Sequence, residues 1–233
     1  MGNSPKMTII GFGVMGKKYA GLFSKVLDVT VVSSRNVRIE VENMGASYCA
    51  DLTTAIGQAG YILICAPLDA LDGIISSINE HSHPECVVID ICSARVAAHE
   101  KLAALKRRHF GLHGNIITGE PDERMLEYLS QTGLYPTRMT PTEHDQLNSI
   151  IGLVHFVGLV LNKHFGSDDR KILAQSPAAS HVLRLMDHLR SNSPATYKET
   201  QIDNGYTGRR RNDLIRAMAE CDRKLNAGEF PFA

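Results

Sequence analysis

The chain has 233 residues, of which 43% are hydrophobic and 21% charged, so it can bury a substantial core in one large domain or two smaller ones. Its 25 basic and 25 acidic residues cancel, and this balance argues against a nucleic-acid partner or an acidic membrane surface. The most apolar stretch, Leu147 to Leu161, is too short to cross a bilayer, and the N-terminal residues lack the apolar core of a secretory signal. The five cysteines show no C-x-x-C spacing, and three of them lie in or beside predicted buried strands, which suits small core residues of a protein in a reducing cytoplasm.

A glycine-rich turn organises the first part of the chain. An apolar run at residues 7–10 leads into Gly11-Phe12-Gly13-Val14-Met15-Gly16, which is followed by a predicted helix, Lys17–Val26, and a second apolar run, Val29–Val32. In a dinucleotide-binding unit of this order, the first glycine allows the tight turn, the second lets a pyrophosphate approach, and the third lets the helix pack on the strand. The helix N-terminus then offers unpaired N–H groups to the phosphates. An ordinary glycine-rich loop is the alternative, but the flanking elements favour a dinucleotide site at these six residues.

The end of the second apolar run indicates which dinucleotide binds. NAD sites carry an acidic residue about 20 residues after the glycine turn, where it bonds the ribose 2′-hydroxyl. Here the place is held by Ser33-Ser34-Arg35-Asn36, which contains no carboxylate. Two hydroxyls and a guanidinium suit a 2′-phosphate, so NADP is the predicted cofactor, with Ser33, Ser34 and Arg35 among its ligands. A solvated turn in which Asn36 caps the next helix is compatible with the same residues.

The rest of the first half alternates between apolar runs and amphipathic segments. This alternation predicts a Rossmann-type α/β fold, a doubly wound parallel sheet over residues 1–139, followed by an all-helical dimerisation and substrate domain over residues 140–233. The expected strands lie at residues 61–65, 86–91, 110–113, 116–118 and 134–139, and the expected helices at residues 37–44, 68–78, 94–107 and 123–131, with a short helical or looped connection at 51–58.

A long helix is expected to begin the second domain. Thr140-Pro141-Thr142-Glu143 forms a capping box with proline at the first helical position. The residues that follow, up to about Phe165, are apolar on nearly every face of a helix, so protein must surround them. The remaining helical residues are too few and too charged to do so. We therefore expect a homodimer that buries this helix.

Polar residues follow three of the expected strands, at the edge of the sheet where ligands bind in open α/β folds. Cys65-Ala66-Pro67 are expected to contact the cofactor through their backbone, and Ser93 and His113 follow the next two strands. His113 suits a general base that accepts a proton as hydride leaves, and Ser93 could orient the same substrate hydroxyl. A histidine that only satisfies a strand end is the alternative. Near the start of the long helix, His144 and Asp145 suit either substrate contact or helix capping. No metal site is predicted.

These motifs occur in an order that resembles prephenate and arogenate dehydrogenases. The matching segments are the glycine turn, Cys65-Ala66-Pro67, the stretch from Val88 to Arg95, Gly111-Leu112-His113 and, most specifically, the segment from Thr142 to Gly158. The resemblance implies oxidative decarboxylation of a cyclohexadienol to a 4-hydroxyphenyl product, the tyrosine-forming step. It also implies that His113 is the catalytic base and Ser93 its helper, and Ser33-Ser34-Arg35 resembles the NADP-using arogenate members.

The chain departs from this family at the substrate side. Gly114 and Asn115 replace the family's Pro-Met pair after the histidine, and Arg95 stands where the family has lysine. Ser180 occupies the position of the family's carboxylate-binding arginine. Nearby His181 and Arg184, together with Asn115 and His144, are the candidate substrate ligands. A dehydrogenase of a specialised pathway with another substrate, or a cofactor-binding protein without turnover, are the alternatives.

Overall fold

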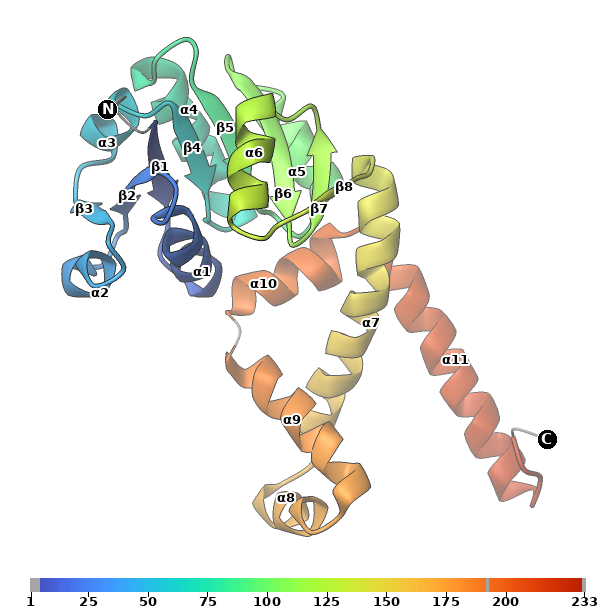
Figure 1. The fold of residues 1–233 in the computed structure, drawn as a ribbon. Helices are drawn as coiled ribbons and strands as arrows, with labels where there is room; N and C mark the ends of the chain where they lie inside the picture. Colours follow the sequence, from blue (N-terminus) through green and yellow to red (C-terminus); the bar gives the residue numbers. More distant parts are fainter. Residues whose placement is uncertain (1–4, 192, 232–233) are drawn as a thin grey trace. The chain divides into compact units, whose positions relative to one another are not determined.

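The computed structural model describes residues 5–191 and 193–231, which divide into two compact units, the first ending at His144 and the second beginning at Asp145. The described residues of the first unit form one eight-stranded sheet in the order β3-β2-β1-β4-β5-β6-β7-β8 (Figure 1). The strands are β1 Lys6–Ile10, β2 Asp28–Val32, β3 Ser47–Cys49, β4 Tyr61–Ile64, β5 Val87–Asp90, β6 Arg108–His113, β7 Ile116–Gly119 and β8 Thr137–Arg138.

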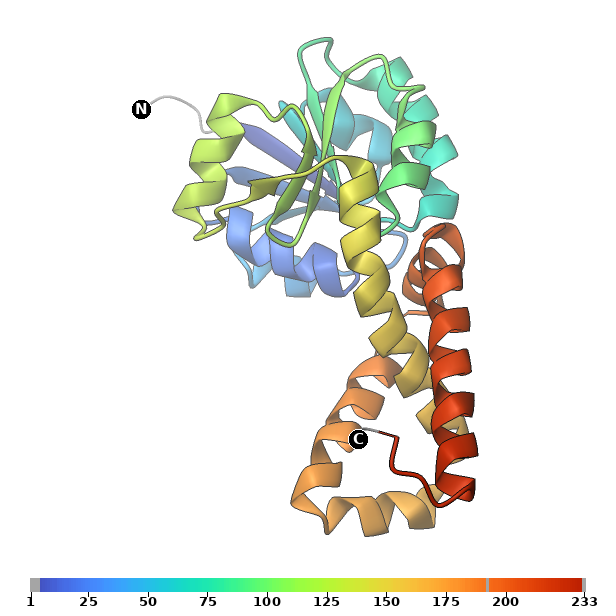
Figure 2. The same ribbon diagram turned by 90° about the vertical axis from the view of Figure 1, so that its right-hand side faces the viewer.

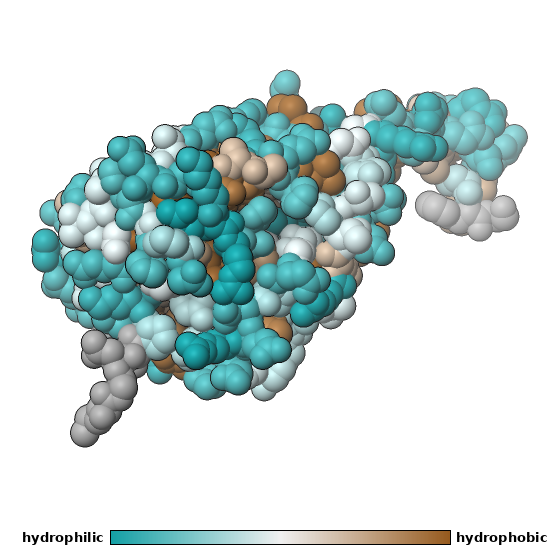
Figure 3. Space-filling model, turned by 90° about the horizontal axis from the view of Figure 1, so that it is seen from above, coloured by the Kyte–Doolittle hydropathy of each residue, from teal (hydrophilic) through white to brown (hydrophobic). Residues whose placement is uncertain are grey.

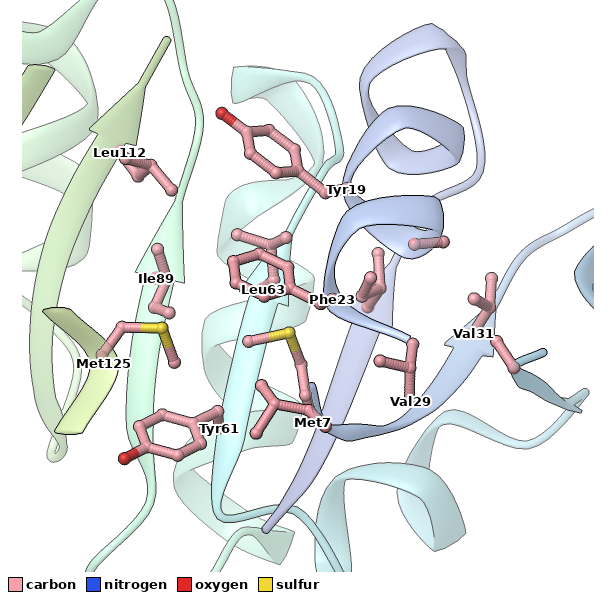
Figure 4. Close-up of a cluster of buried hydrophobic side chains, with 14 of the residues drawn as sticks. Met7, Tyr19, Phe23, Val29, Val31, Tyr61, Leu63, Ile89, Leu112 and Met125 are labelled. Carbon is pink, nitrogen blue, oxygen red and sulfur yellow. The ribbon is translucent and has the colours of Figure 1, made fainter. Parts of the chain in front are cut away.

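Helices cover both faces of this sheet (Figure 2). The helices of the first unit are α1 Val14–Phe23, α2 Arg38–Glu42, α3 Leu52–Gly57, the 3₁₀ turn η1 Leu68–Ala70, α4 Leu71–His81, α5 Arg95–Leu102 and α6 Glu123–Gln131. Residues of α1, α2 and α6 pack in the core cluster on one face, and residues of α3, α4 and α5 pack in the cluster on the other. The first cluster contains Tyr19 and Phe23 of α1, stacked with ring centroids 6.0 Å apart, together with Leu63 of β4 (Figure 4). Such double coverage explains why β1, β4 and β5 are near-continuous apolar runs.

The predicted fold class is confirmed, with local corrections. The expectation that the strands are all parallel is wrong for β7, which pairs with β6 in the antiparallel direction, His113 opposite Ile116. Only Gly114 and Asn115 separate these residues, and a two-residue link can join antiparallel strands but cannot make a crossover. Gly114 has a φ of +60°, which suits the turn.

Other element boundaries also differ from those expected. The edge strand β3 was not predicted, because a run of three half-exposed residues gives little apolar pattern. The helix expected over residues 94–107 ends at Leu102, and the strand expected over residues 134–139 is reduced to Thr137–Arg138.

The second unit is helical. Its elements are α7 Pro141–His164, which begins at the end of the first unit, then α8 Ser167–Ala174, α9 Pro177–Ser191, α10 Pro194–Lys198, the π-helix η2 Glu199–Asp203 and α11 Thr207–Asn226. The expected capping box is present at the start of α7, where Thr140 N–H donates to Glu143 Oε2 at 2.8 Å and Glu143 N–H donates to Thr140 Oγ1 at 3.2 Å. Helix α9 packs closely on α7. At Gly158 of α7, an added Cβ would lie only 2.1 Å from Leu189 Cδ1 of α9.

Much of the apolar surface of α7 and α11 stays exposed within the described chain. On α7 the exposed apolar residues are Leu147, Ile150, Ile151, Val154 and Val160, and on α11 they are Ile215, Met218 and Leu225. By contrast, the face of the molecule seen in Figure 3 is mostly hydrophilic, with hydrophobic residues in small patches. Between residues 5 and 231, leaving out residue 192, no single helix is long and apolar enough to span a membrane, although the bent pair α7 and α8 passes by length and composition.

Candidate cofactor and catalytic site

The glycine turn has the geometry that a dinucleotide site requires. Gly11 has a φ of +100°, and a Cβ there would lie 2.5 Å from the carbonyl oxygen of Cys65. At Gly16 a Cβ would lie 2.2 Å from the carbonyl oxygen of Gly11, so this glycine lets α1 pack against the turn. At Gly13, in contrast, no heavy atom lies within 4 Å of an added Cβ. Two glycines are therefore required by the fold, and the third leaves open space beside the backbone.

The N-terminus of α1 faces this open space. Gly13 is the N-cap and has no side chain to satisfy the first N–H groups of the helix, and the first turn carries no acidic residue. Phe12 is buried and anchors the turn, while Val14 is 69% exposed. Lys17 lies over the Phe12 ring at 5.4 Å and pairs with Glu40 of α2. A positive helix end without a side-chain cap, with space beside Gly13, fits the pyrophosphate of a dinucleotide.

The residues after β2 lie against the glycine turn. The Arg35 guanidinium donates from Nη2 to the carbonyl oxygen of Phe12 at 3.3 Å. The backbone N–H of Arg35 donates to Ser33 Oγ at 3.2 Å, and the Tyr48 hydroxyl donates to the Arg35 carbonyl at 3.4 Å. Both Ser34 and Arg35 are exposed. The structure therefore brings the predicted phosphate ligands to the predicted dinucleotide turn, with a cation at the junction.

Cys65 continues the β4 ladder and then leads into Ala66 and the exposed Pro67. Its N–H donates to the Ile10 carbonyl at 2.8 Å, so the backbone of this segment is fixed beside the glycine turn. Burial raises the pKa of the Cys65 thiol well above its usual range. Burial thus favours the protonated thiol over the thiolate at neutral pH.

A buried ion pair lies at the end of β5. Arg95 donates from Nη2 to Asp90 Oδ2 at 2.9 Å and from Nε to Thr118 Oγ1 at 3.0 Å, and Asp90 and Arg95 are 1% and 2% exposed. A Cβ at Gly111 would lie 1.7 Å from Arg95 Nη2, so the glycine provides the space for the guanidinium. The pair links Asp90 of β5 to Thr118 of β7, with the guanidinium beside Gly111 of β6. Arg95 is therefore directed into the sheet, a role that its position in the sequence does not indicate.

His113 is the last residue of β6, at the same edge of the sheet as Ser93. Asp90 of β5 is paired with Gly111 of β6. Ser93 and His113 each follow one of these paired residues by a few positions, so they lie at neighbouring strand ends. His113 Nδ1 lies 2.8 Å from His144 Nε2, and the two ring planes meet at 74°. His144 is 1% exposed. The contact brings together two predicted site residues that are 31 positions apart in the sequence.

The other predicted substrate ligands are divided between the two units. Asn115 is exposed in the turn between β6 and β7, where its carbonyl accepts the Thr137 N–H at 2.8 Å. His181 and Arg184 lie on α9 in the second unit, exposed, with Arg184 Nη2 2.6 Å from His181 Nδ1. Ser180 Oγ donates to the Pro177 carbonyl at 2.7 Å. Substrate binding by these residues stays a prediction.

A cavity of about 370 Å³ lies in the second unit, where α7 ends and α8 begins. It is lined by Phe165, Gly166, Ser167, Arg170 and Arg190. None of the predicted site residues belongs to it, so the cavity is not evidence for the catalytic site.

Comparisons with known proteins agree with this architecture. A family model described as NADP oxidoreductase, coenzyme F420-dependent, matches residues 6–94, which is less than half of the chain. No curated protein sequence matches the chain.

Several solved structures share the fold. The chain is similar to arogenate dehydrogenase of Synechocystis, with 18% sequence identity, 97% of this chain and 94% of that chain covered, and a TM-score of 0.66. For prephenate dehydrogenase of A. aeolicus, solved with hydroxyphenyl propionate and NAD+, the identity is 11%, the coverage 96% and 91%, and the TM-score 0.71. A 3-hydroxyisobutyrate dehydrogenase of Mycobacterium tuberculosis gives 10% identity, 88% and 94% coverage, and a TM-score of 0.54. The chain has the fold of these dehydrogenases. At such identities the likeness establishes the fold and leaves the substrate to the site itself.

Proposed function

We propose that the chain is a cytoplasmic, NADP-dependent dehydrogenase that oxidatively decarboxylates prephenate, arogenate or a close cyclohexadienyl analogue to a 4-hydroxyphenyl product, the step that forms the tyrosine ring. The observation that carries this proposal is the position of His113, a histidine at the carboxyl edge of a sheet whose first turn has dinucleotide-binding geometry. The similarity in fold to prephenate and arogenate dehydrogenases over nearly the whole chain supports the same proposal.

The cofactor would be held by the first unit. The amides at Gly13 and Val14 would bind the pyrophosphate, Ser33, Ser34 and Arg35 the 2′-phosphate, and the backbone of Cys65-Ala66-Pro67 would lie along the cofactor. When bound, NADP supplies the acceptor for the hydride that leaves the substrate carbon. The match to an NADP oxidoreductase family model over residues 6–94 supports this part of the site.

The chain's own residues would manage the proton. As the carbon bearing the hydroxyl is oxidised, its oxygen must lose a proton, and His113 is placed to accept it. The Ser93 hydroxyl would orient the same oxygen. The buried Asp90–Arg95 pair, bonded to Thr118 of β7, would steady the sheet edge on which both groups lie. Loss of CO₂ and formation of an aromatic ring then make the overall step essentially irreversible.

A substrate that differs from prephenate is the second candidate within this class. Arg95 is paired inside the sheet, and the position expected to hold a carboxylate-binding arginine is Ser180, whose hydroxyl bonds Pro177. Both observations favour a substrate with fewer carboxylates or one that meets another cation, such as Arg184. Prephenate, arogenate and 4-amino analogues distinguish these possibilities, because they differ in charge around the same ring.

We further propose that the second unit forms a homodimer through α7 and α11. Five apolar residues of α7 are between 45% and 50% exposed in the single chain, which is unusual for residues with no partner surface. A dimer that covers them should bury about 2,000 Å² or more in total. Sedimentation should give a dimer at micromolar concentration, and Ile151→Glu should dissociate it. A folded monomer for the unmodified chain would contradict this proposal.

The function is tested with the variant His113→Asn. General base catalysis contributes typically about 10²–10⁴-fold, so turnover should fall by about that factor. NADP affinity should barely change, because the glycine turn is on another strand. Near-normal turnover by the variant on the true substrate would show that another residue is the base. If the unmodified protein binds NADP but turns over neither prephenate, arogenate nor the 4-amino analogues, the chain is better explained as a cofactor-binding protein without turnover.

A further inference from the structure

The contact between His113 and His144 constrains the protonation of the site. The distance of 2.8 Å between Nδ1 of His113 and Nε2 of His144 is that of a hydrogen bond. Two unprotonated ring nitrogens would repel each other at this distance, and two protonated ones would clash. When both rings are neutral, one proton must therefore lie between them.

His144 is held rigidly. It lies in the first turn of α7, where its N–H donates to the Thr140 carbonyl at 3.0 Å beside the Thr140–Glu143 capping box. The residue is 1% exposed, so the ring is shielded from solvent. His113 ends a strand that is paired on both sides, by β5 and by β7. The hydrogen bond thus joins the end of β6 to the first turn of α7, and both residues belong to the first unit.

Two tautomeric arrangements satisfy this hydrogen bond, and they have opposite chemical consequences. If His144 Nε2–H donates, His113 carries its own proton on Nε2 and cannot accept another there. If His113 Nδ1–H donates, His113 Nε2 has a lone pair and can accept a proton from a substrate hydroxyl. Only the second arrangement makes His113 a general base.

We propose that His144 is the positioning residue of the reaction, a neutral acceptor that holds His113 as the Nδ1–H tautomer. This inference rests on the proposed function, because it assigns a role within the same proton transfer. In the step, the substrate O–H bond would break and its proton would form a bond to His113 Nε2, while the oxygen electron pair would become the new C=O bond. Bound NADP would supply the acceptor for the hydride that the carbon loses.

Burial decides where the positive charge then rests. His144 is 1% exposed and His113 is half-buried, so moving the Nδ1 proton on to His144 would place a cation in the more buried ring. In the proposed arrangement the proton therefore stays on His113, and His144 Nε2 keeps accepting the Nδ1–H hydrogen bond. The arrangement is that of a base and its orienting group, with a neutral ring in place of the carboxylate of a serine-protease triad.

The tautomer is measured directly by ¹⁵N NMR of the full-length protein with labelled histidine, without substrate or cofactor. At a pH where both rings are neutral, we expect His113 to be protonated at Nδ1 and His144 to be unprotonated at Nε2, with scalar coupling across the hydrogen bond. A His113 ring protonated at Nε2 in the unmodified protein would overturn the inference, whatever the activity.

Two variants of His144 separate positioning from structure. His144→Gln keeps a side-chain acceptor and should retain the Nδ1–H tautomer and most of the turnover. His144→Phe keeps a ring but no acceptor, so the tautomer signature should be lost and turnover should fall about tenfold to hundredfold, part of the contribution of the base. His164→Phe, the same change at an exposed histidine of α7, is the control.

The outcomes distinguish this inference from the proposed function. If no cyclohexadienyl compound is turned over but the tautomer is as expected, the function fails and the hydrogen-bonded pair stands. If turnover is found but His144→Phe leaves both turnover and the His113 tautomer unchanged, His144 is only a packing residue and the inference fails.

Discussion

Replacement of Gly13 by alanine separates cofactor binding from folding. The residue has φ and ψ of −79° and −163°, a conformation open to alanine, and an added Cβ meets no heavy atom within 4 Å. Alanine is a poorer N-cap than glycine by up to about 1 kcal/mol. For a chain of this size, 1 kcal/mol corresponds to a change in Tm of about 2–4 °C. The variant should therefore fold with nearly normal stability.

The same methyl group should strongly weaken NADP binding. It would occupy the space through which the pyrophosphate approaches the amides at the start of α1, so we expect at least a tenfold rise in Kd, about 1.4 kcal/mol or more. Calorimetric titration with NADP and a thermal melt of the same sample give the two quantities.

Two other glycines of this region are matched controls. Gly16→Ala places a Cβ 2.2 Å from a backbone oxygen that cannot rotate away, so it should destabilise the fold by about 1–3 kcal/mol or more. Gly21→Ala adds a methyl in open space further along α1 and should stabilise the helix by about 0.5–1 kcal/mol, with unchanged Kd. If folded Gly13→Ala binds NADP as tightly as the unmodified chain, the pyrophosphate does not bind at this turn.

Three further changes test other parts of the account. Arg35→Ala should weaken NADP binding by about 1–3 kcal/mol and leave NAD binding nearly unchanged, as measured by calorimetry; tighter binding of NAD than NADP by the unmodified chain would refute the cofactor assignment. Gly111→Ala should destabilise the fold by about 3–5 kcal/mol in denaturant titrations, because its Cβ would displace the Arg95 guanidinium from Asp90. An unchanged unfolding midpoint would contradict the buried Asp90–Arg95 pair. Burial lowers the pKa of His155 below its value of about 6.5 in the unfolded chain, so its contribution to stability is present above about pH 6.5 and lost as pH falls. His155→Phe should therefore reduce the drop in Tm between neutral and mildly acid pH, and an equal drop in both proteins would contradict this.

The fold was predictable where structure is set by neighbouring residues. The glycine turn, the continuous apolar run of β4 and the capping box at Thr140 each lie within a few positions, and each is present in the structure. The alternation of strands and helices wrongly predicts a parallel β7. The two-residue link at Gly114 and Asn115 indicates the antiparallel direction, because it is too short for a crossover.

The site was less predictable because its contacts join distant positions. Ser93 and His113 could be placed at one edge of the sheet, since strand ends of parallel neighbours lie together. The sequence does not indicate whether Arg95 faces substrate or core; that depends on the space at Gly111 and on Thr118 of β7. Nor does the sequence indicate that the ring of His144 meets His113, because this depends on where α7 begins relative to β6.

The proposed activity is the NADP-dependent oxidation and decarboxylation of a cyclohexadienyl substrate at the carboxyl edge of the sheet. The most direct measurement is to incubate the protein with NADP and carboxyl-labelled prephenate, arogenate or a 4-amino analogue, and to quantify reduced cofactor, released CO₂ and the aromatic product together. We predict equal amounts of all three for at least one substrate, and turnover reduced by about 10²–10⁴-fold in His113→Asn. If the protein binds NADP and none of the substrates yields reduced cofactor, the claim is wrong.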